Sequence, residues 1–151
     1  MNWPILMRGA VVAAAPLLIG AAPLEERFQT RLSPVAMDLL TRDDVAGVGQ
    51  ATAILSGDRL KLEGSYRDLP SMATGAELRQ GVAVGARGPT VLPAMVSGGR
   101  QGTIAATVQL SHEQVQALRS GRLYVQVRSE RAPDGNLWGW LLPVSGLPKL
   151  K

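Results

Sequence analysis

Short segments in which apolar residues recur at every second position restrict how this 151-residue chain can fold more than any other feature. The clearest pair, residues 48–55 and 60–69, flanks the turn sequence Ser-Gly-Asp-Arg. A period of two is typical of β-strands with one buried face, and a Gly-Asp turn between two such segments predicts a hairpin. We therefore expect Leu60 and Leu62 to face the core.

Similar segments follow at short intervals along the chain. Residues 28–35 alternate weakly and predict a first strand at the edge of a sheet, ended by Pro34, because proline cannot donate a hydrogen bond to a neighbouring strand. Residues 75–84 alternate again. Two more hairpins are predicted where alternating segments flank Ser-Gly-Gly-Arg-Gln or Arg-Ala-Pro-Asp-Gly-Asn: residues 90–96 with 102–110, and residues 122–130 with 137–143.

One short helix is predicted over about residues 111–120. Ser111 is suited to the N-cap, Gln114 completes a capping box, and Gly121 ends the helix. No helical segment is periodic enough to form a crossover between parallel strands, so we expect antiparallel pairing. The predicted fold class is therefore all-β, an antiparallel sheet with this one helix.

Composition agrees with many short elements in one domain. Glycine (17) and proline (10) are plentiful and aromatic residues are scarce, which favours tight turns over long helices. Cysteine is absent, which excludes disulfides, zinc–thiolate sites and thiol nucleophiles. The net charge of +4 favours attraction to acidic partners or anionic membrane surfaces. Because the charges are interspersed, we expect no nucleic-acid partner.

The N-terminus has the pattern of a secretory signal peptide. One positive charge in the first eight residues precedes an apolar run of fourteen that ends in Gly-Ala-Ala. A retained membrane anchor is the alternative, but Arg8 and Pro16 interrupt the apolar stretch that spanning would need. We expect residues 1–22 to be removed, leaving residues 23–151 as one periplasmic or secreted domain without a membrane span.

The closing segment of the chain resembles a CHRD domain, the chordin-type module of extracellular and secreted bacterial proteins. That family commonly ends in Gly-x-x-Tyr-Val-x-Val-His-Thr, a short loop, and Pro-x-Gly-Glu-Ile-Arg-Gly-Gln. The matching positions here are Gly121, Tyr124, Val125, Val127, Pro133, Gly135 and Gly139. The resemblance implies an immunoglobulin-like antiparallel β-sandwich or barrel over most of the mature chain.

The departures from the family pattern bear on metal binding. Three characteristic histidines are replaced by Glu77, Arg79 and Arg128. The Glu, Arg and Gln of the closing motif are replaced by Asn136, Trp138 and Trp140. Because guanidinium groups cannot coordinate a cation, we expect neither a metal ion nor another cofactor.

No set of catalytic residues is evident in the sequence. The single histidine, His112, lies at the start of the predicted helix, and no Gly-x-Ser-x-Gly nucleophile motif occurs. No acid, base, nucleophile and ligand set converges, so we expect a protein that is not an enzyme.

Strand parity predicts one surface for binding. If Leu137, Gly139 and Leu141 point inward, the two neighbouring tryptophans point outward side by side. The same parity places the other members of this surface outward, and we name it the arginine–tryptophan face: Glu77, Arg79, Tyr124, Gln126, Arg128, Trp138 and Trp140.

Three interpretations of this face follow from its composition. Trp, Tyr and Arg are enriched at binding hot spots, so the first is that an accessory module of the bacterial envelope docks on a partner protein here. The second is a carbohydrate- or small-ligand-binding protein that uses the tryptophan pair as a stacking platform. The third is that the N-terminal segment or the C-terminal tail covers the indoles.

Overall fold

The computed structural model describes residues 20–144, which form nine β-strands and one helix. In chain order the elements are β1 (Glu25–Pro34), β2 (Val48–Ser56), β3 (Arg59–Arg67), β4 (Ala73–Gln80), β5 (Thr90–Val96), β6 (Gly102–Gln109), α1 (His112–Arg119), β7 (Leu123–Ser129), β8 (Ala132–Trp140) and β9 (Leu142–Pro143). The all-β prediction is therefore confirmed.

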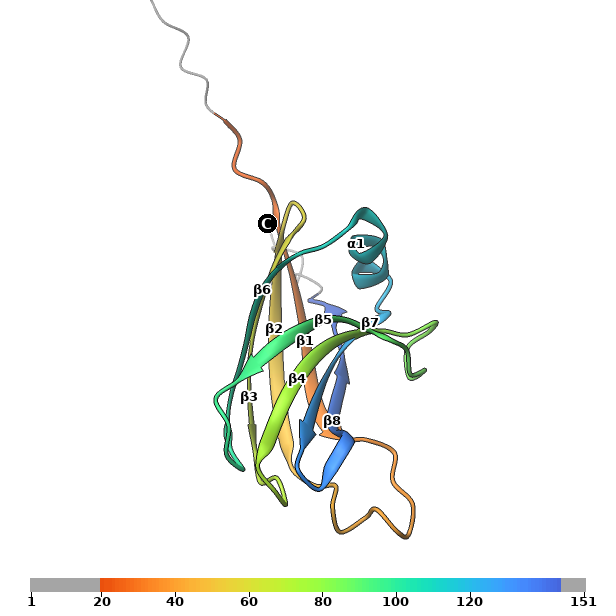
Figure 1. Cartoon of the computed structure of the whole chain (residues 1–151). Coiled ribbons are helices and arrows are strands. Elements are labelled where there is room, and N and C mark those ends of the chain that lie inside the picture. The colour runs from red at the N-terminus through yellow and green to blue at the C-terminus, as the bar shows by residue number, and fades with distance from the viewer. Residues whose placement is uncertain (1–19, 145–151) are drawn as a thin grey trace, which may run out of the picture.

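Eight of the strands close into an antiparallel barrel (Figure 1). The order is β2-β3-β6-β5-β4-β7-β8-β1, and the pairing of β1 with β2 closes it. The expectation that residues 28–35 form an edge strand was wrong. β1 pairs with β2 on one side and with β8 and β9 on the other, because closing the barrel needs both of its edges.

The predicted hairpins form, with one turn displaced. β2 and β3 pair from Ser56–Arg59 onward, and β5 pairs with β6 at Met95 and Val96. In the last hairpin Ser129 pairs with Ala132, so the tight turn is Glu130-Arg131 and not Pro-Asp-Gly. The Pro-Asp-Gly-Asn sequence instead bulges out of β8 before pairing with β7 resumes at Leu137.

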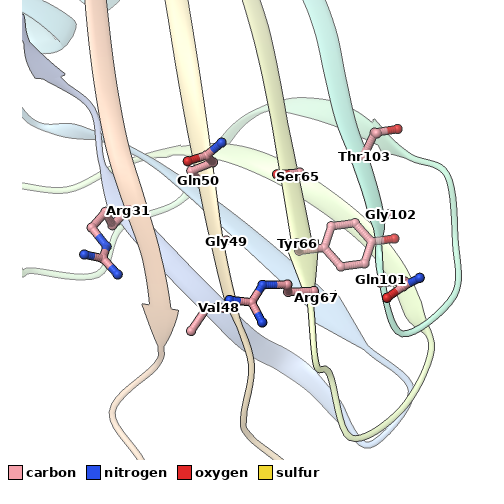
Figure 2. Close-up of a pocket in the computed structure, with 10 residues that line it drawn as sticks. All are labelled: Arg31, Val48, Gly49, Gln50, Ser65, Tyr66, Arg67, Gln101, Gly102 and Thr103. Carbon is pink, nitrogen blue, oxygen red and sulfur yellow. The ribbon is translucent and has the colours of Figure 1, made fainter.

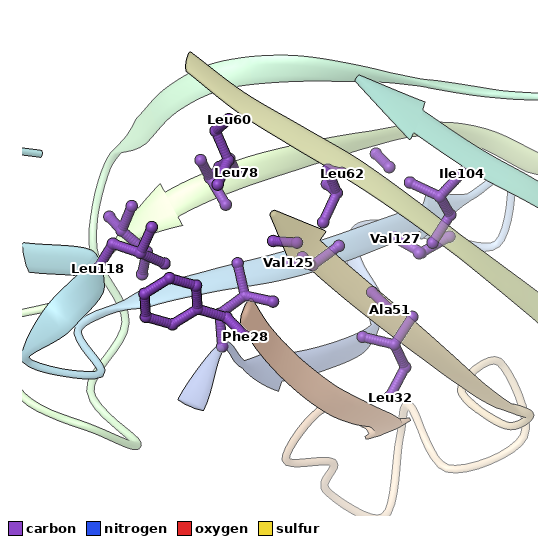
Figure 3. Close-up of a cluster of buried hydrophobic side chains, with 14 of the residues drawn as sticks. Phe28, Leu32, Ala51, Leu60, Leu62, Leu78, Ile104, Leu118, Val125 and Val127 are labelled. Carbon is purple, nitrogen blue, oxygen red and sulfur yellow. The ribbon is translucent and has the colours of Figure 1, made fainter. Parts of the chain in front are cut away.

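The helix α1 has the predicted caps. The Gln114 amide donates to the Ser111 hydroxyl at 3.2 Å, and the Ser111 amide donates to Gln114 Oε1 at 2.8 Å. Gly121 follows the helix with φ +69°, the left-handed conformation that glycine adopts easily. α1 lies at one end of the barrel, where Leu118 packs near Phe28 (Figures 1 and 3).

The barrel interior is filled by the alternate apolar residues of its strands (Figure 3). Leu60 and Leu62 are buried, as predicted, and so are Val125 and Val127 of β7. Each such side chain contributes about 1.5–3 kcal/mol by leaving water. The parity of β3 and β7 is therefore fixed by this interior, and it decides which residues point outward.

The prediction of a signal peptide falls mainly on residues 1–19, which lie outside the described residues. Residues 20–24 precede β1 and belong to no strand. Within residues 20–144 no helix is both long and apolar enough to cross a membrane.

Candidate functional site

The three positions at which the family histidines are replaced meet in space. β4 pairs with β7 so that Glu77 lies opposite Gln126 and Gly75 opposite Arg128, which places Glu77 and Arg128 as diagonal neighbours on the outer face. Glu77 Oε1 accepts a hydrogen bond from Arg79 Nη1 at 2.9 Å and lies 3.7 Å from Arg128 Nε. The Thr90 hydroxyl donates to the other oxygen, Oε2, at 2.5 Å.

Glu77 is held as a carboxylate by these neighbours. It is only 7% exposed, and burial raises the pKa of its carboxyl group. The hydrogen bond from Thr90, the hydrogen bond and charge of Arg79, and the charge of Arg128 together lower that pKa by more, so the net direction is downward. The group is a charged anchor inside the face.

A polar cavity of about 420 Å³ opens beside this anchor, and we name it the arginine pocket. Arg128 is 43% exposed, yet its Nε is buried and has no hydrogen-bond partner in the described chain. Arg87, from the loop between β4 and β5, places its guanidinium carbon 5.3 Å from the centre of the Trp138 ring. The pocket is lined by Glu77, Arg79, Arg87, Thr90, Gln126, Arg128, Pro133 and Asp134.

The aromatic members of the face form a packed layer beside the pocket. Tyr124 stacks on Trp140 with ring centres 4.7 Å apart and planes at 27°. Trp138 meets Trp140 at 4.7 Å with planes at 67°. None of the three belongs to the buried cluster of the barrel interior, whereas Val125, Leu137 and Leu141 do, so the three aromatic residues lie on the outside as predicted. The two indoles are half-buried, and the buried Trp140 Nε1 has no hydrogen-bond partner within residues 20–144.

Exposure on this face differs from the prediction, because Tyr124, Gln126 and Glu77 are buried. Glu77 is enclosed by Arg79, Thr90 and Arg128, and Gln126 lies under the β8 bulge, while Tyr124 is covered in part by the loop 81–89. Its Gly88 amide donates to the Tyr124 hydroxyl at 3.0 Å, and Arg79 Nε donates to the Gly88 carbonyl at 2.8 Å. The C-terminal tail, one of the two segments that could cover the indoles, lies from residue 145 onward outside the described residues.

Two buried amide side chains hold the β8 bulge in place. Gln126 Nε2 donates to the Asp134 carbonyl at 2.9 Å. Asn136 donates to the Ser129 hydroxyl at 2.9 Å and accepts from the Ala46 amide at 3.1 Å. Gln126 therefore supports the pocket wall from inside. The partly exposed members of the predicted face are Arg79, Arg128, Trp138 and Trp140.

A second and larger hollow, of about 720 Å³, was not found from the sequence (Figure 2). It lies on the outer face of β1, β2, β3 and β6, where Arg31, Gln50, Ser65 and Thr103 form one cross-strand row. Its polar side chains are exposed to water except for Tyr66, which is buried and donates its hydroxyl to the Gly98 carbonyl. Arg67 is already paired with Asp68 at 2.6 Å. The lining is Arg31, Val48, Gly49, Gln50, Ser65, Tyr66, Arg67, Gln101, Gly102 and Thr103.

The arginine pocket is the better candidate of the two. No buried polar atom in the lining of the larger hollow lacks a partner, whereas Arg128 Nε in the arginine pocket does. A solvated polar row is the ordinary outer surface of a sheet.

Residues that could bind a metal ion or act as a catalytic base are not brought together within residues 20–144. Among residues 20–144 no three His, Cys, Asp or Glu side chains are grouped closely enough to hold a metal ion. His112 lies exposed in the first turn of α1.

Comparison with known proteins gives one family. The sequence pattern of the CHRD domain matches residues 28–141, which runs from within β1 to the residue after β8. Comparisons with curated proteins and with solved structures gave no match.

Proposed function

This chain belongs to the CHRD domain family, and on that premise we propose that it is an exported, non-catalytic accessory module that binds a partner protein through the arginine–tryptophan face. The exported location rests on the N-terminal pattern of a short basic start, an apolar run and small residues. The binding role rests on the face itself.

One observation carries the proposal: Arg87 and Arg128 line one pocket beside two half-exposed indoles. Arginine and tryptophan are the residue types most enriched at binding hot spots. The buried Glu77 and Tyr124 side chains fix the positions of their neighbours before a partner arrives, which lowers the entropy lost on binding.

The geometry gives no support to a carbohydrate-stacking platform. Trp138 and Trp140 cross at 67°, so they do not present one flat surface. One ring of the pair, Trp140, is already stacked on Tyr124.

The test is recovery of a partner from envelope extract with immobilised protein and quantitative mass spectrometry. We expect Arg87→Ala combined with Arg128→Ala to reduce recovery of a specific protein at least about tenfold, because central arginine contacts commonly contribute more than about 1.4 kcal/mol. Arg31→Ala, an exposed arginine in the other hollow, is the matched control and should recover the partner normally. Equal recovery by all three proteins would contradict the proposal.

Arginine variants are preferred to the double change Trp138→Ala and Trp140→Ala. Both indoles pack against each other and around Tyr124. Removing them would lower stability by up to about 3–5 kcal/mol and would confuse lost folding with lost binding.

A further inference from the structure

We infer that the arginine pocket binds a carboxylate, and that the partner protein therefore presents an Asp or Glu side chain at this point. The inference rests on the proposed function and names the chemistry of the partner at that same face.

One of the three arginines in the pocket, Arg79, already has hydrogen-bond partners within the protein. Arg79 donates one terminal N–H to Glu77 and its Nε–H to the Gly88 carbonyl, and its side chain is only 25% exposed. Arg79 and Glu77 thus form the floor of the pocket and neutralise each other. Arg87 and Arg128 are the other two cations of the lining, and Asp134 is its second carboxylate.

Arg128 is held in position, but its Nε has no hydrogen-bond partner in the described chain. Its Nη2 lies 3.2 Å from the place that a β-carbon would occupy on Gly75, so the absence of a side chain there makes room for the guanidinium. Its Nε points toward Glu77 at 3.7 Å, which is too long for a hydrogen bond. A guanidinium carries only donors, arranged in a planar fork, and the terminal pair matches the two oxygens of a carboxylate.

Arg87 lines the same pocket from the loop between β4 and β5. It belongs to the loop 81–89, which is anchored through Gly88, and its guanidinium lies over the Trp138 ring. It forms no ion pair within residues 20–144. A cation–π contact does not use a hydrogen-bond donor, so the N–H groups of Arg87 remain available to an anion.

The charge of the pocket lining favours a carboxylate over a phosphate. Three arginines against Glu77 and Asp134 leave a small net positive charge in the pocket lining. A monoanion matches that excess, whereas a phosphate monoester at about −1.5 to −2 would meet repulsion from the two carboxylates. The larger charge is therefore disfavoured, and a single acidic side chain fits the site.

The test follows the Arg128 Nε–H signal by NMR in isotopically labelled, full mature protein. The probes are N-acetylglutamate α-amide, the uncharged N-acetylglutamine α-amide, and inorganic phosphate. We expect a saturable shift with the glutamate probe, with Kd on the order of 1–10 mM for one isolated contact. We expect no shift with the glutamine probe, and at least about tenfold weaker binding of phosphate.

Two variants complete the experiment. Arg128→Lys removes the signal and so assigns it, while Arg31→Lys, with the same change of chemistry in the other hollow, should retain both the signal and its response. Arg87→Lys should weaken the glutamate probe severalfold while the melting temperature stays unchanged, because Arg87 is exposed.

The outcomes separate this inference from the proposed function. An Arg128 signal that the glutamate probe does not move, or that the glutamine probe moves equally, overturns the carboxylate site. Tighter binding of phosphate overturns it in favour of a phosphate site. Loss of partner recovery in the arginine variants would leave the proposed function standing in either case, whereas glutamate binding together with unchanged partner recovery would overturn the proposed function alone.

Discussion

Gly139 separates two tryptophans because the neighbouring strand leaves no room for a side chain there. A β-carbon at this position would overlap the backbone carbonyl of Arg31 and the hydroxyl of Thr30, and would lie 3.1 Å from Leu32 Cδ2. Parity directs this position inward, between Leu137 and Leu141, while the flanking indoles point outward. The glycine therefore lets β1 and β8 approach each other where they pair.

We predict that Gly139→Ala destabilises the protein by about 1–3 kcal/mol, because the atom in the way belongs to the backbone of β1 and cannot rotate aside. Thermal unfolding would show a fall of several degrees. Gly75→Ala is the matched control, since the nearest atom to its added methyl is the flexible end of Arg128. Equal melting temperatures for the two variants would contradict the explanation.

Glu77 makes stability depend on pH in a defined direction. Burial raises the pKa of its carboxyl group, but Thr90, Arg79 and Arg128 lower it further, so the folded value lies below the ordinary 4.5. Because the pKa is lower in the folded protein than in the unfolded chain, the ionised group stabilises the fold. That contribution is complete above about pH 4.5 and is lost as pH falls through the folded pKa.

We therefore predict that Glu77→Gln lowers the free energy of unfolding by about 1–3 kcal/mol at pH 7. The difference from wild type should shrink as pH falls below about 4.5, where the wild-type carboxylate also becomes protonated. Urea unfolding at pH 7, 5, 4 and 3 measures it. Glu63→Gln, which removes an exposed carboxylate, should stay within about 0.5 kcal/mol of wild type at pH 7. A Glu77→Gln deficit that is constant with pH would argue against an ionised anchor.

The sequence predicted which side of the sheet each side chain points to better than it predicted whether that side chain is exposed. Alternation correctly placed Tyr124, Glu77 and both indoles on the outside of the barrel. It could not show that Tyr124 and Glu77 would be buried there. Tyr124 is covered in part by the loop 81–89, although the alternation that predicts a strand over residues 75–84 continues into this loop and β4 ends at Gln80. Glu77 is enclosed by Arg79, Thr90 and Arg128, contacts that alternation does not specify.

Among the structural elements, β5 and β6 form one of the two shortest pairings in the barrel, the other being that of β1 with β8. β5 and β6 pair only at Met95 with Ala105 and at Val96 with Ile104, and then diverge. Inward-facing residues along this seam are only half-buried, unlike those of the other strands: Leu92, Ala94, Ala106 and Val108. The hairpin sequence predicted that the strands meet, but the length of their contact depends on how the whole barrel closes.

We predict that this seam opens more readily than the rest of the barrel. Residues 106–109 of β6 pair with β3 alone, whereas β7 pairs on both edges with β4 and β8. Hydrogen exchange of β6 amides that face the seam should be at least about tenfold faster than that of β7 amides, since exchange follows the local free energy of opening. Equal protection of the two strands would show that the seam is closed in solution.

At the scale of the whole molecule, barrel closure was the step that the sequence did not reveal. Local patterns predicted the hairpins and the helix, because turns and caps involve neighbours in the chain. The pairing of β1 with β2 and β8 joins residues far apart in sequence, and no local pattern specifies it. For the same reason parity predicted only half of the arginine pocket: Glu77, Arg79, Gln126 and Arg128. The residues that the loop 81–89, the start of β5 and the β8 bulge contribute were missed: Arg87, Thr90, Pro133 and Asp134.

The position of β1 leads to the last prediction, which concerns export. Glu25 is the first residue to pair in the barrel, and the exposed residues 20–24 ahead of it belong to no strand. Cleavage after Ala21 or Ala22 would therefore leave every described strand intact. We expect protein recovered from the periplasm or medium to begin at Ala22 or Pro23, and a chain that starts at Pro23 to unfold at the same temperature as the exported protein. N-terminal sequencing and paired thermal melts measure both. Intact Met1 on protein extracted from membranes would instead identify the segment as a retained anchor, and a lower melting temperature for the shortened chain would show that the segment contributes to the fold.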